Sequence, residues 1–195
     1  PAKQSPDTFR SAPLALEPAD ELLKRPDDND LTDASTAFKA ERLVYQSDAI
    51  DAPMTIAGVM DLVAHVSLDV PDTDIGCVIE AVLPQGRTIV LGQDFVRARF
   101  RSDLSTEKPV TPGAIESYRF DGFGFTVREL PKGTRLRLVL APINTPSLQK
   151  NYNSGGRIGY ETADTARTAL VSVHLDPKHP SYLELPLAPE SGAAK

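Results

Sequence analysis

The sequence lacks what several large functional classes need. Its one cysteine, Cys77, excludes an internal disulfide framework and any multi-cysteine metal site. The formal net charge of -6 argues against a protein that binds the phosphates of DNA or RNA, because such proteins concentrate lysine and arginine. No apolar run approaches the roughly 20 residues that span a bilayer, and the N-terminus has no basic-then-apolar signal-peptide pattern. We therefore expect a soluble protein with neither a nucleic-acid nor a membrane partner.

Residues 1–40 differ from the rest of the chain, since they are proline-spaced, acidic and poor in β-branched residues. The stretch "EPADELLKR" (17–25) predicts one short helix, because its proline suits a first helical turn and its charges match the helix dipole. We interpret residues 1–40 as an N-terminal connector. The sequence begins at Pro1 without an initiator methionine, which suggests processing or excision from a longer polypeptide.

From Glu41 onward the hydrophobic pattern has a period of two. In "DLVAHVSLDV" (61–70) every second residue is apolar, as in a half-buried strand, and "IGCVIEAVLPQGRTIVLG" (75–92) predicts two strands joined by a turn at residues 84–86. Five further segments, among them "QDFVRARFR" (93–101), repeat the pattern, giving about ten strands. The predicted fold is all-β: a jelly-roll (galactose-binding-like) β-sandwich over residues 41–188, with a tail at 189–195.

No catalytic motif is present. α/β-Hydrolases hold their serine on a strained G-x-S-x-G turn, and the sequence has no such turn. His65, His174 and His179 have no cysteine or acidic partner at metal-ligand spacing, so we interpret each as structural or solvated. Cys77 lies on the apolar side of an alternating run, which favours a core residue over a nucleophile. The sequence therefore predicts no catalytic residue, metal site or cofactor in this chain.

Two charged patterns leave alternatives open. Asp69, Asp72 and Asp74 could hold a hard cation, but the EF-hand pattern is missing, and a turn whose aspartates accept backbone N–H groups is the preferred interpretation. Two series of alternating arginines, at positions 97, 99 and 101 and at positions 135 and 137, each predict one face of a strand. We interpret these faces as solvated, with a protein interface as the alternative.

The long connector at residues 142–167 is the main candidate for a binding or interface role. It contains "SLQKNYNSGG" (147–156), which is almost entirely polar. Asn151 and Asn153 can hydrogen-bond backbone groups and tolerate left-handed geometry, and Tyr152 can anchor the loop. We expect a structural plug that shapes one end of the sandwich, with a substrate-side or interface role for these three residues as the alternative.

Several segments resemble one family in the same order. They are "RLVYQSDAIDAPMTIAG" (42–58), "VSLDVPDTDIGCVIEAVLPQGR" (66–87), "LRLVLAP" (136–142), "QKNYNSGG" (149–156) and "VSVHLDPKHPSYLELPL" (171–187). Together they resemble the C-terminal domain of the X-prolyl dipeptidyl aminopeptidases and their acyl-esterase relatives, which include bacterial cocaine esterase, α-amino-acid ester hydrolases and glutaryl cephalosporin acylases. The resemblance implies a jelly roll packed against an N-terminal α/β-hydrolase domain that carries the catalytic Ser, Asp and His. None of these catalytic positions has a counterpart in this chain.

The leading functional hypothesis is thus an accessory domain of a serine hydrolase that acts on ester or peptide bonds, in the bacterial cytoplasm. Its expected partner is the N-terminal hydrolase domain of the same polypeptide, whose cleft it would help to shape. A free-standing carbohydrate- or ligand-binding sandwich is a second hypothesis, which the absence of tryptophan and the 6% aromatic content weaken. An oligomerisation domain that uses the arginine faces, giving a homo-oligomer, is the third.

Overall fold

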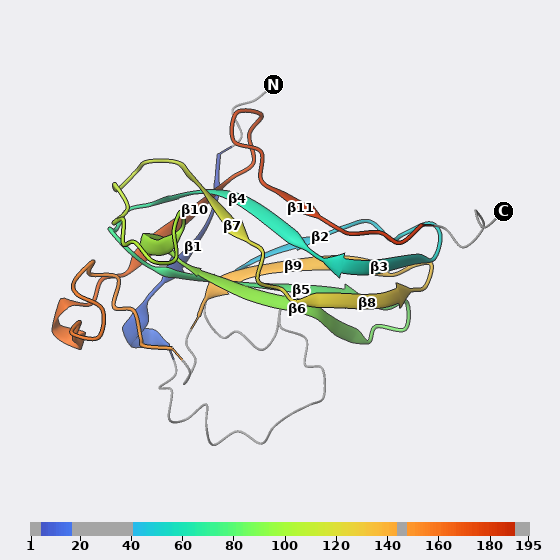
Figure 1. The fold of residues 1–195 in the computed structure, drawn as a ribbon, viewed down its shortest axis with the longest axis horizontal. Helices are drawn as coiled ribbons and strands as arrows, with labels where there is room; N and C mark the ends of the chain where they lie inside the picture. The colour runs from blue at the N-terminus through green and yellow to red at the C-terminus, as the bar shows by residue number, and fades with distance from the viewer. Residues whose placement is uncertain (1–4, 17–40, 144–147, 190–195) are drawn as a thin grey trace, which may run out of the picture.

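The computed structural model describes residues 5–16, 41–143 and 148–189, and these are built from β-strands and short 3-10 helices (Figure 1). The strands are β1 (Asp7–Ser11), β2 (Leu43–Gln46), β3 (Met54–Val59), β4 (Asp61–Leu68), β5 (Asp74–Val82), β6 (Thr88–Arg97), β7 (Glu116–Phe120), β8 (Phe125–Leu130), β9 (Arg135–Pro142), β10 (Ala169–His174) and β11 (Tyr182–Glu184). The 3-10 helices are η1 (Pro13–Ala15), η2 (Ala98–Phe100) and η3 (Ala163–Thr165). In this part of the chain no helix reaches seven residues, so the predicted all-β sandwich is confirmed.

All strand pairs are antiparallel. The first sheet has the order β1-β10-β4-β11, and β7 also pairs with β4. His65 of β4 has His174 of β10 as one neighbour and Ser117 of β7 as the other, so β7 and β10 lie on opposite edges of β4. The second sheet has the order β2-β9-β5-β6. A third unit is the two-stranded ribbon of β3 and β8. Since β3 runs into β4 through the buried Met60, this ribbon prolongs the β4–β7 pair.

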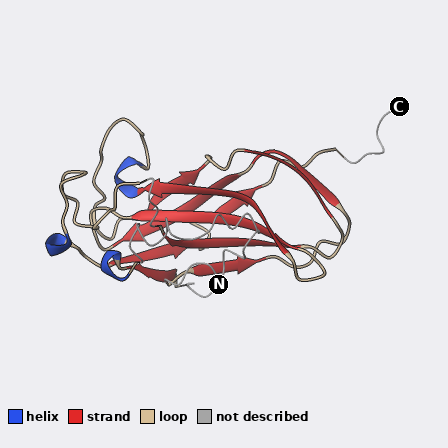
Figure 2. Cartoon of the chain, turned by 90° about the horizontal axis from the view of Figure 1, so that it is seen from below, coloured by secondary structure: helices blue, strands red, loops and turns tan. Residues whose placement is uncertain are grey.

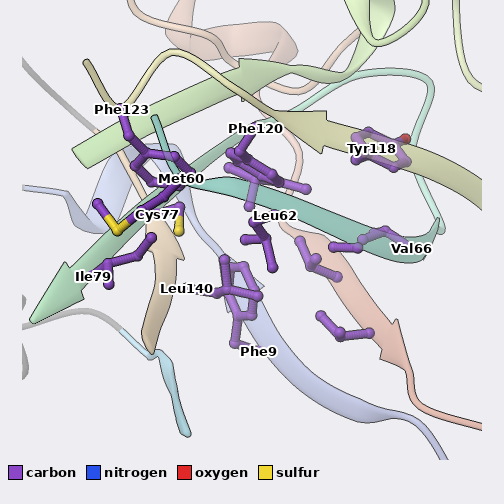
Figure 3. Packing of buried hydrophobic residues seen from close by; sticks show 14 of the residues in the cluster. Phe9, Met60, Leu62, Val66, Cys77, Ile79, Tyr118, Phe120, Phe123 and Leu140 are labelled. Carbon is purple, nitrogen blue, oxygen red and sulfur yellow. The ribbon is translucent and has the colours of Figure 1, made fainter. Parts of the chain in front are cut away.

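The core lies between the two sheets, and the alternation of apolar residues sets which side chains enter it. Strand β4 buries Leu62, Ala64, Val66 and Leu68, as its sequence predicts. Cys77 lies in the same cluster as Met60 and Ile79, which confirms its interpretation as a core residue (Figure 3). A one-residue slip of β4 would expose this whole set, and burial contributes about 1.5–3 kcal/mol for each large aliphatic side chain.

The hairpin of β5 and β6 forms where the sequence predicts it. Leu83 N donates to Arg87 O at 2.8 Å, and Gly86 N donates to Leu83 O at 2.8 Å. Gly86 has a φ of +85°, a left-handed conformation that glycine adopts without steric cost. The turn at residues 84–86 therefore closes the hairpin.

A β-bulge interrupts this hairpin between Ile79 and Glu80. Between the turn and the bulge, Val82 pairs with Thr88 and Glu80 with Val90. On the far side of the bulge the register has shifted by one residue, so that Ile79 pairs with Gly92. The extra residue places Arg97 opposite Asp74, where an unbroken ladder would have placed Val96. The bulge thus decides which side chain faces Asp74.

One strand lies in the segment that was interpreted as a connector. β1 pairs with β10 from Asp7 opposite Val173 to Ser11 opposite Ala169, and Phe9 enters the core. The sequence analysis placed no strand there, because five residues between prolines offer too little alternation to detect. The helix predicted over residues 17–25 lies outside the described residues, as do 190–195 of the predicted tail. The division of the chain at residues 40 and 188 stays a prediction.

The two ends of the sandwich differ in character. The 3-10 helices lie at one end of the strands (Figure 2), together with residues 148–168, and we call this the loop end. The β3–β8 ribbon lies at the opposite end, which we call the ribbon end (Figure 1). Within the described ranges, no helix has the length and apolar character needed to cross a membrane.

Candidate functional site

Two buried ion pairs form the centre of the candidate site at the loop end. Asp72 and Asp74 lie where the β4–β5 connection enters β5, and Arg97 and Arg99 lie at the end of β6 and in η2. Arg97 Nε and Nη2 donate to the two carboxylate oxygens of Asp74 at 2.8 and 2.7 Å. Arg99 binds Asp72 through its Nε, at 2.7 Å, and its backbone N, at 2.9 Å. The Arg97–Asp74 pair is bidentate, the arrangement that adds geometric specificity to an ion pair, whereas Asp72 binds one guanidinium nitrogen of Arg99 and its backbone N–H.

Asn151 joins the two ion pairs. Its Nδ2 donates to Asp72 Oδ2 at 2.8 Å and to Asp74 Oδ1 at 2.9 Å. Its Oδ1 accepts a hydrogen bond from Asn153 N at 2.8 Å. One side-chain amide therefore links the β4–β5 connection to the polar loop.

Asn153 fastens the loop to two further segments. Its Nδ2 donates to Ser11 O at 3.0 Å and to Arg167 O at 2.9 Å, so that the end of β1 and the start of β10 meet at one side chain. Its φ of 61° is left-handed, a conformation that asparagine tolerates better than most residues. Asn153 is buried, whereas Tyr152 is half-exposed with the Lys150 ammonium 5.7 Å from its ring centre.

The loop also packs closely on the connection that carries Asp72. Gly155 has a φ of +75°, and a Cβ added there would lie 2.5 Å from Pro71 Cγ. Arg99 Nη1 donates to Gly156 O at 2.8 Å, and it also contacts Glu107 Oε2 at 3.1 Å. The connection at 101–113 is thereby tied to the same network.

The electrostatics of the site fit a structural network. Burial raises the pKa of Asp72, and the charge and hydrogen bonds of Arg99 and the amide of Asn151 act in the opposite direction. The hydrogen bonds that Arg97 donates to Asp74 raise the pKa of Arg97, so its guanidinium stays charged. Arg101 pairs with Glu116 beside these groups. Arg97, Arg99 and Arg101 thus each have a carboxylate partner within the chain.

The predicted solvated face of Arg97, Arg99 and Arg101 is therefore wrong. The strand ends at Arg97, and the chain turns into η2, where Ala98 N donates to Thr73 O at 2.8 Å. Arg99 is buried, and Arg101 donates to the carbonyl of Ala98 at 2.9 Å. An alternating sequence pattern predicts neither the β-bulge nor this turn. The shared two-residue spacing of Asp72 and Asp74 before the hairpin and of Arg97 and Arg99 after it was the available signal.

The second arginine pair also departs from a purely solvated face. Arg135 is exposed and donates to Ser47 O at 3.1 Å. Arg137 is partly buried, and its Nη1 lies 3.5 Å from an oxygen of the buried Glu80. Only Arg135 fits the interpretation.

Two of the three aspartates accept backbone N–H groups, as predicted, but from distant segments and not within a local turn. Asp69 Oδ1 accepts a hydrogen bond from Leu170 N at 2.7 Å, and Asp72 accepts one from Arg99 N, so two of the three cap backbone groups. Asp74 instead binds the Arg97 side chain. In the described part of the chain no group of three or more His, Cys, Asp or Glu side chains is arranged to hold a metal ion.

The three histidines converge, which the sequence analysis did not foresee. His65 and His174 lie opposite each other on β4 and β10, on the side away from the core, and the His179 ring is 5.8 and 5.9 Å from theirs. The convergence follows from the β4–β10 pairing, which no local pattern reveals. Burial and the charges of His179 and His65 lower the pKa of His174.

The histidine cluster does not form a catalytic triad. Ser67 Oγ lies 2.9 Å from His174 Nε2, a distance suited to a nucleophile and its base. Asp176, however, hydrogen-bonds the Nδ1 of His179, at 3.1 Å, and not His174. Among the described residues the third group of a triad is thus not in place on His174.

An apolar pocket of about 220 Å³ opens between the two sheets. Its walls include Tyr45, Leu138, Val173 and Tyr182. The Tyr45 hydroxyl donates to Asp7 Oδ2 at 3.1 Å, and burial together with Asp7 raises the pKa of Tyr45. Ser181 also lines the pocket, and its hydroxyl is engaged inside the chain, because it donates to His174 O at 2.7 Å.

Comparisons with known proteins identify the family of this chain. A family model described as the X-Pro dipeptidyl-peptidase C-terminal non-catalytic domain matches residues 4–184. The cocaine esterase of Rhodococcus sp. (strain MB1 Bresler) is 30% identical over 145 residues, which are 74% of this chain and 25% of the esterase.

Two solved structures share the fold. An aminopeptidase from a marine sediment Thaumarchaeota archaeon has a TM-score of 0.81 at 21% identity, covering 96% of this chain and 34% of that one. An α-amino acid ester hydrolase has a TM-score of 0.80 at 18% identity, covering 96% and 33%. This chain thus spans a quarter to a third of the length of these relatives. The resemblance inferred from the sequence is confirmed, and the chain belongs to the family of X-Pro dipeptidyl-peptidase C-terminal non-catalytic domains.

Proposed function

We propose that this chain is the C-terminal part of a longer serine hydrolase of the α/β-hydrolase type, which acts on ester or peptide bonds. The chain stabilises the catalytic domain and forms part of the wall of its cleft. One observation carries the proposal: a non-catalytic family model covers residues 4–184, while the relatives are three to four times longer than the matched region.

The structure of the loop end supports a scaffolding role. The side-chain amides of Asn151 and Asn153 form hydrogen bonds within the chain, which hold the loop in place. Tyr152, between them, lies half-exposed at the surface of the loop. Further along the loop, Tyr160 is exposed and the Arg157 guanidinium lies 4.3 Å from its ring centre. A loop held from inside that presents tyrosine and arginine outside is suited to contact a neighbouring domain or a substrate.

The two other hypotheses lose support. An oligomerisation domain built on the faces of Arg97, Arg99 and Arg101 lacks its surface, because these side chains are bound to carboxylates and carbonyls. A carbohydrate module needs flat aromatics on one face, whereas the exposed rings of Phe125 and Tyr160 belong to opposite ends of the sandwich. Homo-oligomer formation through another surface stays a separate proposal.

The test is covalent labelling with a fluorophosphonate probe, together with an activated ester as substrate. We expect stoichiometric labelling of one serine upstream of Pro1 in the longer protein, and none within residues 1–195. Acyl transfer needs an activated nucleophile, a base and an oxyanion hole, and the chain presents none of these as a set. Labelling of a serine within the 195 residues, at Ser67 for example, would overturn the proposal.

A further inference from the structure

The outer face of the β3–β8 ribbon is apolar and exposed. Ala57 lies opposite Val127, and Val59 lies opposite Phe125, so these four side chains form two neighbouring cross-strand pairs on one face. Phe125 is 74% exposed, Val127 65% and Val59 49%. We call Ala57, Val59, Phe125 and Val127 the ribbon patch.

The ribbon patch is not the side of the ribbon that enters the core. Ile56 and Leu130 point the other way along the same strands, and both are fully buried. An antiparallel pair with one face in a core normally carries polar residues on the other. Here the inner face buries Ile56 and Leu130, although Arg128 on that face is exposed, and the outer face is apolar as well. An apolar outer face is the pattern of a ribbon that is covered on that side too.

The ribbon patch also has the boundaries of an interface. At one end Asp61 follows Val59 by two residues, and Arg119 Nη2 binds its carboxylate at 2.5 Å. At the other end Thr55 lies opposite the exposed Glu129. An apolar centre between two polar edges is the ordinary anatomy of a protein interface.

We propose that the ribbon patch is the surface on which the catalytic domain of the same polypeptide docks, an inference that rests on the proposed function. The matched relatives carry two thirds or more of their length outside the region that this chain spans, so a large neighbouring domain is part of each of them. A covalently tethered domain meets the patch at a high effective concentration, and it keeps the patch permanently covered. Permanent cover also prevents the aggregation that an exposed apolar face invites.

The test measures how accessible the ribbon patch is in the longer hydrolase. Phe125→Cys and Val127→Cys are made separately, and each is reacted with a maleimide under native and denaturing conditions, with peptide-level mass spectrometry as readout. The native Cys77 is buried in the core and serves as an internal reference. The matched control is Leu104→Cys, which replaces a 91% exposed apolar residue at the loop end.

We expect both ribbon variants to react at least about tenfold more slowly than Leu104→Cys after normalisation to the denatured rates, because labelling then waits for the domains to separate. Equal rates would overturn the inference. Protection that vanishes on dilution, while the sedimentation coefficient falls from dimer to monomer, would assign the patch to a second copy and would also overturn it. If the patch is exposed while the fluorophosphonate still labels a serine upstream, only this inference fails and the proposed function stands.

Discussion

The loop end and the ribbon end of the sandwich reverse the usual distribution of polar and apolar side chains in opposite ways. At the loop end Asp72, Asp74 and Arg99 are buried and Arg97 is partly buried, and each finds its partners within the chain. At the ribbon end Phe125 and Val127 are exposed, and the described part of the chain does not cover them. The difference teaches that the buried charges of the first end are satisfied within the chain, whereas the apolar patch of the second end has no cover in the described part of the chain.

The largest effect is expected when the buried network is broken. Asp72→Ala removes the carboxylate that pairs with the buried Arg99 Nε and accepts its backbone N–H, and breaking a buried pair in this way costs about 3–5 kcal/mol of unfolding free energy. Denaturant titration would measure the change. The control Asp164→Ala removes an exposed carboxylate of η3 and should stay within about 0.5 kcal/mol. If both variants lost similar amounts of unfolding free energy, the burial of the Asp72–Arg99 pair would not explain the loss in Asp72→Ala.

A smaller effect is expected at the second asparagine of the loop. Asn153→Ala removes the donor to the carbonyls of Ser11 and Arg167, which should cost about 1–3 kcal/mol. Asn153→Gly loses the same donor but accepts the left-handed φ, so it should be less destabilised than Asn153→Ala by up to about 1 kcal/mol. Thermal unfolding separates the two contributions. Unchanged stability of both variants would place Asn153 in a surface role.

The histidine cluster should make stability depend on pH to a smaller extent. Burial and two neighbouring histidines lower the pKa of His174, so the unfolded chain takes up a proton first as the pH falls. The unfolding free energy that the neutral His174 contributes is fully present above about pH 6.5, the ordinary pKa of histidine. It is lost as the pH falls from there towards the lower pKa that His174 has in the folded protein. Urea midpoints on both sides of that window should differ less in His174→Gln than in the native protein. An equal or larger pH dependence in the variant would contradict the assignment.

The smallest effect is expected at the ribbon patch when only this chain is measured. Phe125→Ser removes an exposed ring and one cross-strand pair with Val59, so the unfolding free energy should change by at most about 1 kcal/mol. The same substitution in the longer hydrolase should cost more, because the ring is buried there. Chemical denaturation of both proteins makes the comparison. Equal losses would remove the distinction between the two ends.

Much of the fold was predictable because alternation is a local property. The apolar face of β4 and the β5–β6 turn at residues 84–86 could be read from neighbouring residues alone. Cys77 could be assigned to the core for the same reason. Such patterns need no knowledge of which strands pair.

The candidate site was less predictable because it depends on pairings between distant segments. Asn151 was identified as structural, but its partners Asp72 and Asp74 were treated as a separate turn. Arg97 faces Asp74 only because of the bulge at Ile79 and Glu80, and a bulge leaves no clear trace in the hydrophobic pattern. Without that shift the arginines appear to alternate on a solvated strand.

The strand β1 has a consequence for the order in which the protein folds. It is the first described strand of the chain, yet its partner β10 is almost the last. During synthesis β1 must therefore wait until residues 169–174 have emerged, and pairing of such distant segments is intrinsically slow. The edge of β10 stays open for pairing with other chains until β1 arrives, so the closing of the first sheet is the step at which a nascent chain is most exposed to misassembly.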